Sequence, residues 1–146
     1  MVVEIKIDEA YATPKIVIHT NRITPQVTDL VKKLSKDTPE LLTAFKDDEV
    51  YLLNPNDVLN IYTEGQKIFA QLESGTFRLK NRLYELEDLF EGTAFLRISN
   101  SEIVNFNKVE RLDLSINGTI SLKLKSGGNS FVSRRYVEKI KKYLGL

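Results

Sequence analysis

The sequence predicts an α+β fold in which a small β-β-α unit over residues 1–46 precedes a mainly β domain over residues 47–146. Two observations support this prediction. Short stretches rich in β-branched and aromatic residues are separated by turns that contain Gly, and Asn117-Gly118 is typical of a two-residue hairpin turn. Other stretches repeat apolar residues at helical spacing, which predicts one helix in the N-terminal unit and two short helices in the domain.

The first 46 residues are predicted to fold in the order strand, strand, helix. Residues 2–7 and 15–20 have the composition and alternation of strands. Thr24-Pro25 indicates a helix start, because Thr caps helices and Pro is tolerated at the first helical position. An apolar stripe follows at Val27, Leu30, Val31 and Leu34. Residues 36–46 are expected to join this unit to the domain.

The next part of the chain predicts a first group of three strands, at residues 58–62, 67–73 and 76–80. Glu64-Gly65 and Ser74-Gly75 are the expected turns, because Gly adopts the positive φ that tight hairpins need. Asn81 is expected to cap a short helix that ends at Gly92. The apolar face of this helix consists of Leu83, Leu86, Leu89 and Phe90.

A second group of strands is predicted at residues 109–116, 119–125 and 129–132, with turns at Asn117-Gly118 and at residues 126–128. Ile120, Leu122 and Leu124 alternate with polar residues and should share one face of the sheet. The last helix is expected to begin after Ser133. Its buried residues should be Val137, Ile140 and Leu144.

Composition argues against several functional classes. The 146 residues contain no Cys, which excludes disulfides, thiolate nucleophiles and Cys-ligated zinc. The one His, His19, lies in a predicted strand without a nucleophile or carboxylate at motif spacing, so we expect no enzyme activity, no cofactor, no metal site and no small-molecule substrate. The acidic run Asp47-Asp48-Glu49 is better explained as a solvated loop than as a cation site. No signal peptide or membrane span is evident, and we expect a cytoplasmic protein.

Charge is unevenly distributed although the net charge is only +1. Residues 47–96 carry 4 basic and 10 acidic side chains, a balance of −6, whereas residues 97–146 carry 10 basic and 4 acidic side chains, a balance of +6. A polarised surface of this kind can steer a polyanion toward one side of the protein. Alternatively, the two parts neutralise each other in the fold.

The start of the last predicted helix breaks a local rule. Arg134 and Arg135 follow Ser133, although cations in a first helical turn face the positive end of the helix dipole at a cost of about 0.3–1 kcal/mol each. Glu138 is close enough along the helix to relieve part of that cost. A bound anion is the alternative, because backbone N–H groups, a hydroxyl and two guanidinium groups converge there.

Three segments of the chain resemble LytTR-type DNA-binding domains, and the resemblance covers residues 47–146. They are residues 82–87 (Arg-Leu-Tyr-Glu-Leu-Glu), residues 95–105 (Phe-Leu-Arg-Ile-Ser-Asn-Ser-Glu-Ile-Val-Asn) and residues 131–136 (Phe-Val-Ser-Arg-Arg-Tyr). The resemblance implies elongated antiparallel sheets that place loops, and not a recognition helix, in successive major grooves of double-stranded DNA.

The resemblance also implies which residues contact DNA. The contacts fall in three loops: Gln66 and Lys67 in the first, Ser99, Asn100 and Ser101 in the second, and Ser133, Arg134 and Arg135 in the third. Arg suits guanine, and Asn or Gln suits adenine.

Other residues of the resembling segments are expected to be structural. Arg97 and Asn105 should hold the second loop by hydrogen bonds, and Phe95 and Val104 should lie in the core. Glu102 departs from the family pattern. Because phosphate would repel its carboxylate, it should point away from DNA or pair with a basic neighbour.

The 46 preceding residues are too few for a receiver domain, so the chain resembles the stand-alone regulators of this family. That resemblance implies a transcription regulator acting as a homodimer on paired half-sites, with a small membrane protein as a further partner. The main alternative is a non-catalytic protein–protein interaction module. Binding of single-stranded RNA is less favoured, because four aromatic residues that could stack on bases are expected in the core instead. They are Phe69, Phe77, Phe106 and Phe131.

Overall fold

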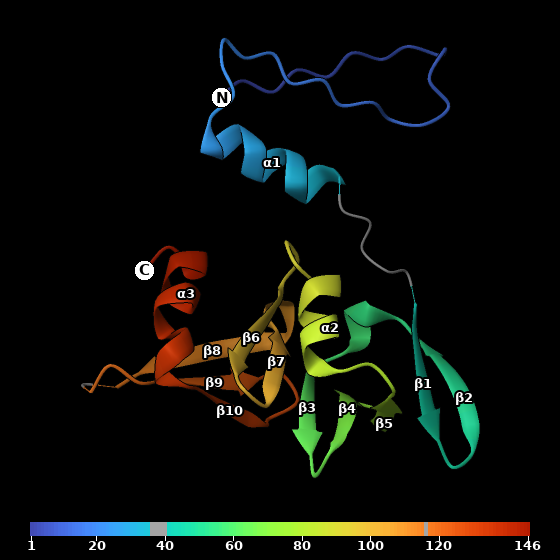
Figure 1. Ribbon diagram of the computed structural model, residues 1–146, viewed down its shortest axis with the longest axis vertical. Helices are drawn as coiled ribbons and strands as arrows, with labels where there is room; N and C mark the ends of the chain where they lie inside the picture. The colour runs from blue at the N-terminus through green and yellow to red at the C-terminus, as the bar shows by residue number, and fades with distance from the viewer. Residues whose placement is uncertain (36–40, 116) are drawn as a thin grey trace.

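The structure is a computed structural model that describes residues 1–35, 41–115 and 117–146. It is an α+β fold rich in antiparallel strands, as the sequence predicts (Figure 1). None of the described helices is long and apolar enough to cross a membrane. The elements in chain order are α1 (Pro25–Ser35), β1 (Leu42–Lys46), β2 (Glu49–Leu53), a 3₁₀ turn (Pro55–Asp57), β3 (Asn60–Glu64), β4 (Lys67–Leu72), β5 (Gly75–Leu79), α2 (Leu83–Leu89), β6 (Phe95–Ser99), β7 (Glu102–Asn105), a second 3₁₀ turn (Phe106–Lys108), β8 (Val109–Leu114), β9 (Ile120–Leu124), β10 (Asn129–Val132) and α3 (Arg134–Leu144).

Two antiparallel sheets form the main body. The larger has seven strands in the order β2-β1-β5-β4-β3-β7-β6, and the smaller has three in the order β10-β9-β8. The turns at Gly65 and Gly75 confirm the first predicted group of strands, and the turn at Gly118 confirms the hairpin of the second group. Ile116, the end of one predicted strand, lies outside the described residues.

The β1–β2 hairpin was not predicted. Residues 42–46, assigned to the join, form β1 and pair with both β2 and β5. Asp47 and Asp48 form the turn with φ values of 51° and 63°, the left-handed conformation that two-residue hairpin turns require. Asp adopts this conformation more readily than most residues, but without a Gly the sequence carries no clear turn signal. Residues 36–40 of the predicted join lie outside the described part of the chain.

A hydrophobic core lies on each side of the β3–β7 region. The first lies between the larger sheet and α2, where the Phe90 and Phe95 rings stack with centroids 4.3 Å apart. The second lies between the smaller sheet, α3 and the outer strands of the larger sheet. Ile120, Leu122 and Leu124 are all buried in it, as their alternation predicts. The second core also buries Val104, and Phe95 lies in the first, so both expected core positions are confirmed.

A half-buried carboxylate connects the two sheets. Glu102 Oε2 accepts hydrogen bonds from Asn60 Nδ2 at 2.8 Å and from Ser130 Oγ at 2.6 Å. The carboxylate is thus turned into the protein, which agrees with the expectation that it points away from DNA, and its described partners are not basic. Two neutral donors satisfy the charge inside the protein, and they come from β3 and β10.

The N-terminal unit differs from its prediction. Helix α1 is present, and Thr24 Oγ1 accepts a hydrogen bond from the Val27 N–H at 3.3 Å, as expected of a cap. The two strands predicted at residues 2–7 and 15–20 are not formed. A two-stranded ribbon needs a packed face to be stable, and here side chains such as Val2 and Ile7 are 86% and 95% exposed.

One helix start is also shifted. Asn81 does not cap α2; Arg82 occupies the N-cap position, and its backbone N–H donates to Glu85 Oε1 at 3.2 Å. The Glu85 carboxylate thus accepts from the N-cap residue itself, whereas an Asn81 cap would accept from an N–H of the first helical turn.

Candidate nucleic-acid interface

The β6–β7 turn carries three of the predicted site residues. It connects Ser99 to Glu102 in a hairpin whose register shifts between Arg97 and Ser99. The Ser99 hydroxyl accepts a hydrogen bond from the Ser101 N–H at 3.2 Å, which closes the turn internally. The Asn100 side chain stands at the exposed tip between the two serines.

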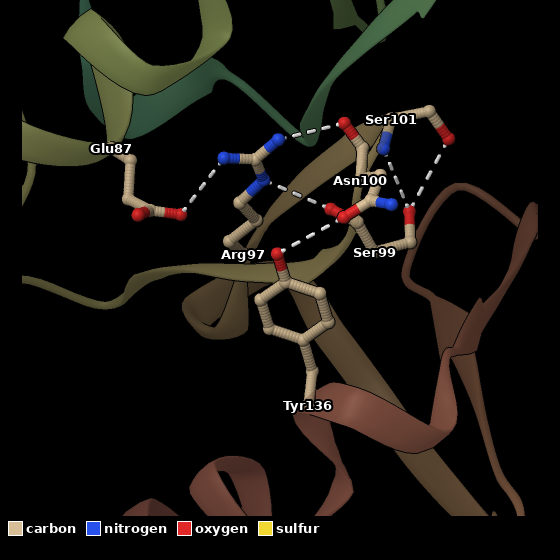
Figure 2. Close-up of polar contacts among 6 residues, drawn as sticks. All are labelled: Glu87, Arg97, Ser99, Asn100, Ser101 and Tyr136. Carbon is tan, nitrogen blue, oxygen red and sulfur yellow. Dashed lines mark hydrogen bonds and ion pairs between the residues drawn. The ribbon is translucent and has the colours of Figure 1, made fainter.

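Arg97 holds this turn from inside, as predicted (Figure 2). Its Nε donates to the Ser99 carbonyl at 3.0 Å, and its Nη2 donates to the Asn100 carbonyl at 2.8 Å. Nη1 lies 3.5 Å from Glu87 Oε2 on α2. Two carbonyl oxygens and one carboxylate therefore fix the guanidinium group and with it the backbone of the turn.

Asn105 does not hold the turn, contrary to expectation. Its Nδ2 donates to the Val58 carbonyl at 2.9 Å, and its Oδ1 accepts from the Asn107 N–H at 3.0 Å. The residue is buried and structural, but it joins the end of β7 to the segment before β3.

The β3–β4 turn carries Gln66 and Lys67, both exposed. Gly65 in this turn has a φ of 61°, which keeps the turn short. The Thr63 N–H donates to the Ser101 carbonyl at 2.9 Å. This backbone hydrogen bond places the first two predicted loops beside each other.

The start of α3 is attached to the same region. The Ser133 N–H donates to the Ile98 carbonyl on β6 at 2.8 Å. Arg134 and Arg135 follow in the first helical turn, both exposed, and neither forms an ion pair with Glu138 or with any other described residue. The Ser133 side chain makes no capping hydrogen bond, although serine commonly caps helices.

Tyr136 connects the third loop to the second, a contact that the sequence analysis missed. Its hydroxyl lies 3.4 Å from Asn100 Oδ1 (Figure 2). Tyr136 belongs to a segment that resembles the family, but a sequence does not show which neighbour a tyrosine hydroxyl reaches. All eight predicted residues thus lie at two strand turns and at the start of α3, and these three places are hydrogen-bonded to one another or to β6.

One predicted core aromatic is instead on the surface. Phe131 is 72% exposed, on the face of β10 opposite the buried Ser130 and Val132. Alternation along the strand explains this difference, because both neighbours of Phe131 point into the second core.

The chemistry of the three turns suits recognition of base edges. Asn and Gln amides can each donate and accept a hydrogen bond at adenine, and a guanidinium group can donate two at guanine. The described residues contain no group of His, Cys, Asp or Glu that could hold a metal ion.

Both the sequence and the fold match a known protein family. Residues 48–145 match the LytTr DNA-binding domain family. The chain belongs to this family. A solved LytTr DNA-binding domain from Bacillus cereus has the same fold, with a TM-score of 0.71 and 25% identity, and the match covers 74% of this chain and 99% of the solved domain.

Sequence relatives of this LytTr protein extend the match toward the N-terminus. One from Staphylococcus aureus strain MSSA476 is 36% identical over 133 residues, which are 91% of this chain and 86% of the relative. Another, from strain NCTC 8325, is 34% identical over 130 residues, which are 88% of each chain. Both are named as uncharacterized HTH-type transcriptional regulators.

A helix-turn-helix unit consists of two helices joined by a short turn. In the described part of this LytTr protein, five strands separate α1 from α2 and five more separate α2 from α3. The candidate residues lie in two strand turns and at the start of α3, and not along a recognition helix.

Proposed function

We propose that this protein is a sequence-specific transcription regulator that binds double-stranded DNA through the turns β3–β4 and β6–β7 and the start of α3. Its membership of the LytTr family supports DNA binding, and the names of its relatives support a regulatory role. The observation that carries the proposal is the convergence of eight polar side chains, six of them exposed, from two strand turns and the start of α3.

In this proposal the residues of the three segments contact different parts of the DNA. Arg135 donates to guanine O6 and N7, while Asn100 and Gln66 bind adenine N6 and N7. Lys67 contacts phosphate. Ser99, Ser101, Ser133 and Arg134 flank these residues and bind the backbone or adjacent base edges.

The proposal includes a dimer. One domain of this size reads a short half-site, so specificity in a genome requires two copies on half-sites about one or two helical turns apart. The N-terminal unit is the proposed dimerisation surface, because it exposes large apolar side chains. A small membrane protein that restrains the regulator is the further partner suggested by the family resemblance.

Selection of bound sequences from a random duplex pool tests the proposal. An enriched motif is expected, and its affinity should fall with salt at a log–log slope of about −0.9 per phosphate neutralised. Lys67→Ala should weaken all sequences alike and make the slope shallower by about one unit. No enriched motif, and no retardation of duplex DNA even at low salt, would favour the interaction-module alternative.

A further inference from the structure

A basic groove lies beside the β3–β4 turn of the candidate interface. It has a volume of about 760 Å³ and is bordered by the β3–β4 turn, the segment from β5 to α2, and Arg97 on β6. Its lining includes Thr63, Gln66, Asn81 and Tyr84, which can form hydrogen bonds, and five cationic side chains. The five are Lys67, Arg78, Lys80, Arg82 and Arg97.

The charge of this groove contrasts with that of the surrounding segment. Residues 47–96 have a balance of −6, yet all four of their Lys and Arg residues line the groove. No Asp or Glu is among the described residues that line it. A concave surface lined by one sign of charge concentrates the potential and attracts counter-ions of the opposite sign.

Most of these cations are not neutralised by a residue that the structure describes. Lys67, Arg78 and Arg82 form no ion pair with a described residue, and all three are exposed. Lys80 Nζ lies 4.3 Å from the centroid of the Phe45 ring, a contact that leaves its charge uncompensated. Of the five, Arg97 alone has an ion pair with a described residue, Glu87.

The position of the groove indicates its ligand. Gln66 and Lys67 border it on one side, and on the other side Arg97 holds the Asn100 turn while also lining the groove. We propose that the groove binds the DNA backbone, taking phosphodiester groups between the bases read by the β3–β4 and β6–β7 turns. This inference rests on the proposed function and adds Arg78, Lys80, Asn81 and Arg82 to the interface.

The openness of the groove favours a polymer backbone over a small phosphorylated molecule. Sites for small molecules are usually enclosed and predominantly apolar, with a few polar groups. Here the cations that line the groove, apart from Arg97, are exposed on a surface continuous with the β3–β4 turn. Cationic side chains distributed along an open groove are suited to successive phosphates.

The test compares two double variants of the full chain on a duplex with one selected half-site. Lys80→Gln/Arg82→Gln removes two groove charges. Lys32→Gln/Lys33→Gln removes two exposed charges from α1. The groove lies at the start of α2, whereas α1 lies beyond the end of that helix (Figure 1). The groove variant should bind about 30-fold more weakly at 150 mM salt, with a slope shallower by about 1.8, and its base preferences should be unchanged. The α1 variant should match the wild type in all three respects.

Neutral methylphosphonates, placed one at a time along the duplex, locate the contact. At one or two phosphates between the two groups of read bases, neutralisation should weaken the wild type but not the groove variant. Lys80→Arg, which retains the charge, should bind with the wild-type slope. Thermal melts of every variant show whether folding is retained.

Three outcomes would overturn the inference. A folded groove variant with the wild-type slope, or methylphosphonate effects identical in variant and wild type, would exclude a backbone contact here. Tight binding of pyrophosphate to the free protein, lost in the groove variant, would instead identify a small-anion site. In each case the wild type still binds the selected duplex, so the groove inference is rejected while the proposed function is retained. If the wild type binds no duplex at all, the proposed function fails with it.

Discussion

Arg135 lies in the first turn of α3 without an ion pair to any described residue, although the dipole of that helix disfavours a cation there. A guanine that accepts two hydrogen bonds from the Arg135 guanidinium would compensate for this unfavourable position. We expect Arg135→Ala to cost about 1–3 kcal/mol of binding free energy and to relax preference at one base pair, measured by a base-by-base affinity profile.

Arg111→Ala is the matched control for this arginine. Arg111 is also exposed, but it lies 3.7 Å from Asp113 on β8, away from the three turns. Its substitution should leave the base preferences intact. If Arg135→Ala keeps the wild-type profile, or lowers the melting temperature sharply, this arginine is structural.

Asn100 and Tyr136 should act as a pair. The hydroxyl of Tyr136, 3.4 Å from Asn100 Oδ1, orients the amide without occupying its N–H donors. Asn100→Ala should cost about 1–3 kcal/mol at a base pair other than that of Arg135. Tyr136→Phe should produce a smaller loss at the same base pair as Asn100→Ala, and the two losses should not add in the double variant. Additive losses would mean that Tyr136 acts independently.

The β6–β7 turn depends on one side chain for its shape. Arg97→Ala removes the donors to two carbonyl oxygens, so the free energy of unfolding should fall by about 1.5–3 kcal/mol and DNA affinity should fall as well. Arg97→Lys keeps the charge but loses the planar fork, and should also bind weakly. Denaturant unfolding and DNA titration measure the two effects.

Glu87→Gln separates the ion pair from the turn. The Glu87 contact is 3.5 Å long and partly exposed, so its loss should cost less than about 1 kcal/mol of stability and leave DNA binding unchanged. A large loss of DNA affinity in this variant would show that α2, and not the carbonyl contacts, positions Arg97.

The junction of the two sheets depends on Glu102. Glu102→Ala leaves buried donors of Asn60 and Ser130 unsatisfied, and we expect the free energy of unfolding to fall by about 2–4 kcal/mol. Glu102→Gln retains an acceptor oxygen and should cost less. Chemical denaturation tests both variants. Equal, small effects would mean that water replaces the carboxylate.

The whole molecule has a DNA-binding body and an N-terminal unit that packs little against it. Ile16 and Ile18 lie with Val31 and Leu34 around a shallow hollow against α1, while most apolar side chains before α1 remain exposed. Deletion of residues 1–40 should therefore preserve binding to one half-site and abolish cooperative binding to paired half-sites. The measurement is a titration of single and paired duplexes. Unchanged cooperativity would assign dimerisation to residues 41–146.

Only the fold shows where the charged side chains of the acidic middle and the basic C-terminal third lie in space. The sequence shows an acidic middle and a basic C-terminal third, and one reading was mutual neutralisation. The fold gathers the four cations of the acidic segment into one groove beside the β3–β4 turn, and it pairs Arg97 of the basic third with Glu87 of the acidic segment. Linear charge sums cannot show this, because neighbours along a strand point to opposite faces.

The amino-acid sequence alone determined the elements whose signals are local. Asn117-Gly118 predicted a hairpin, Thr24-Pro25 predicted a helix start, and the alternation of Ile120, Leu122 and Leu124 predicted a buried face, because each depends on residues a few positions apart. The motif segments likewise predicted the family, and Arg97 as the support of its turn.

Only the tertiary structure decided which segments meet. Strand-like residues 2–7 form no ladder because no segment in the described part of the chain covers them, whereas residues 42–46 become β1 because β5 and β2 pair with them. The bond from Tyr136 to Asn100, the role of Glu102 between the sheets and the basic groove all join residues far apart in the chain. Such contacts follow from packing of the sheets and helices, which no local pattern in the sequence encodes.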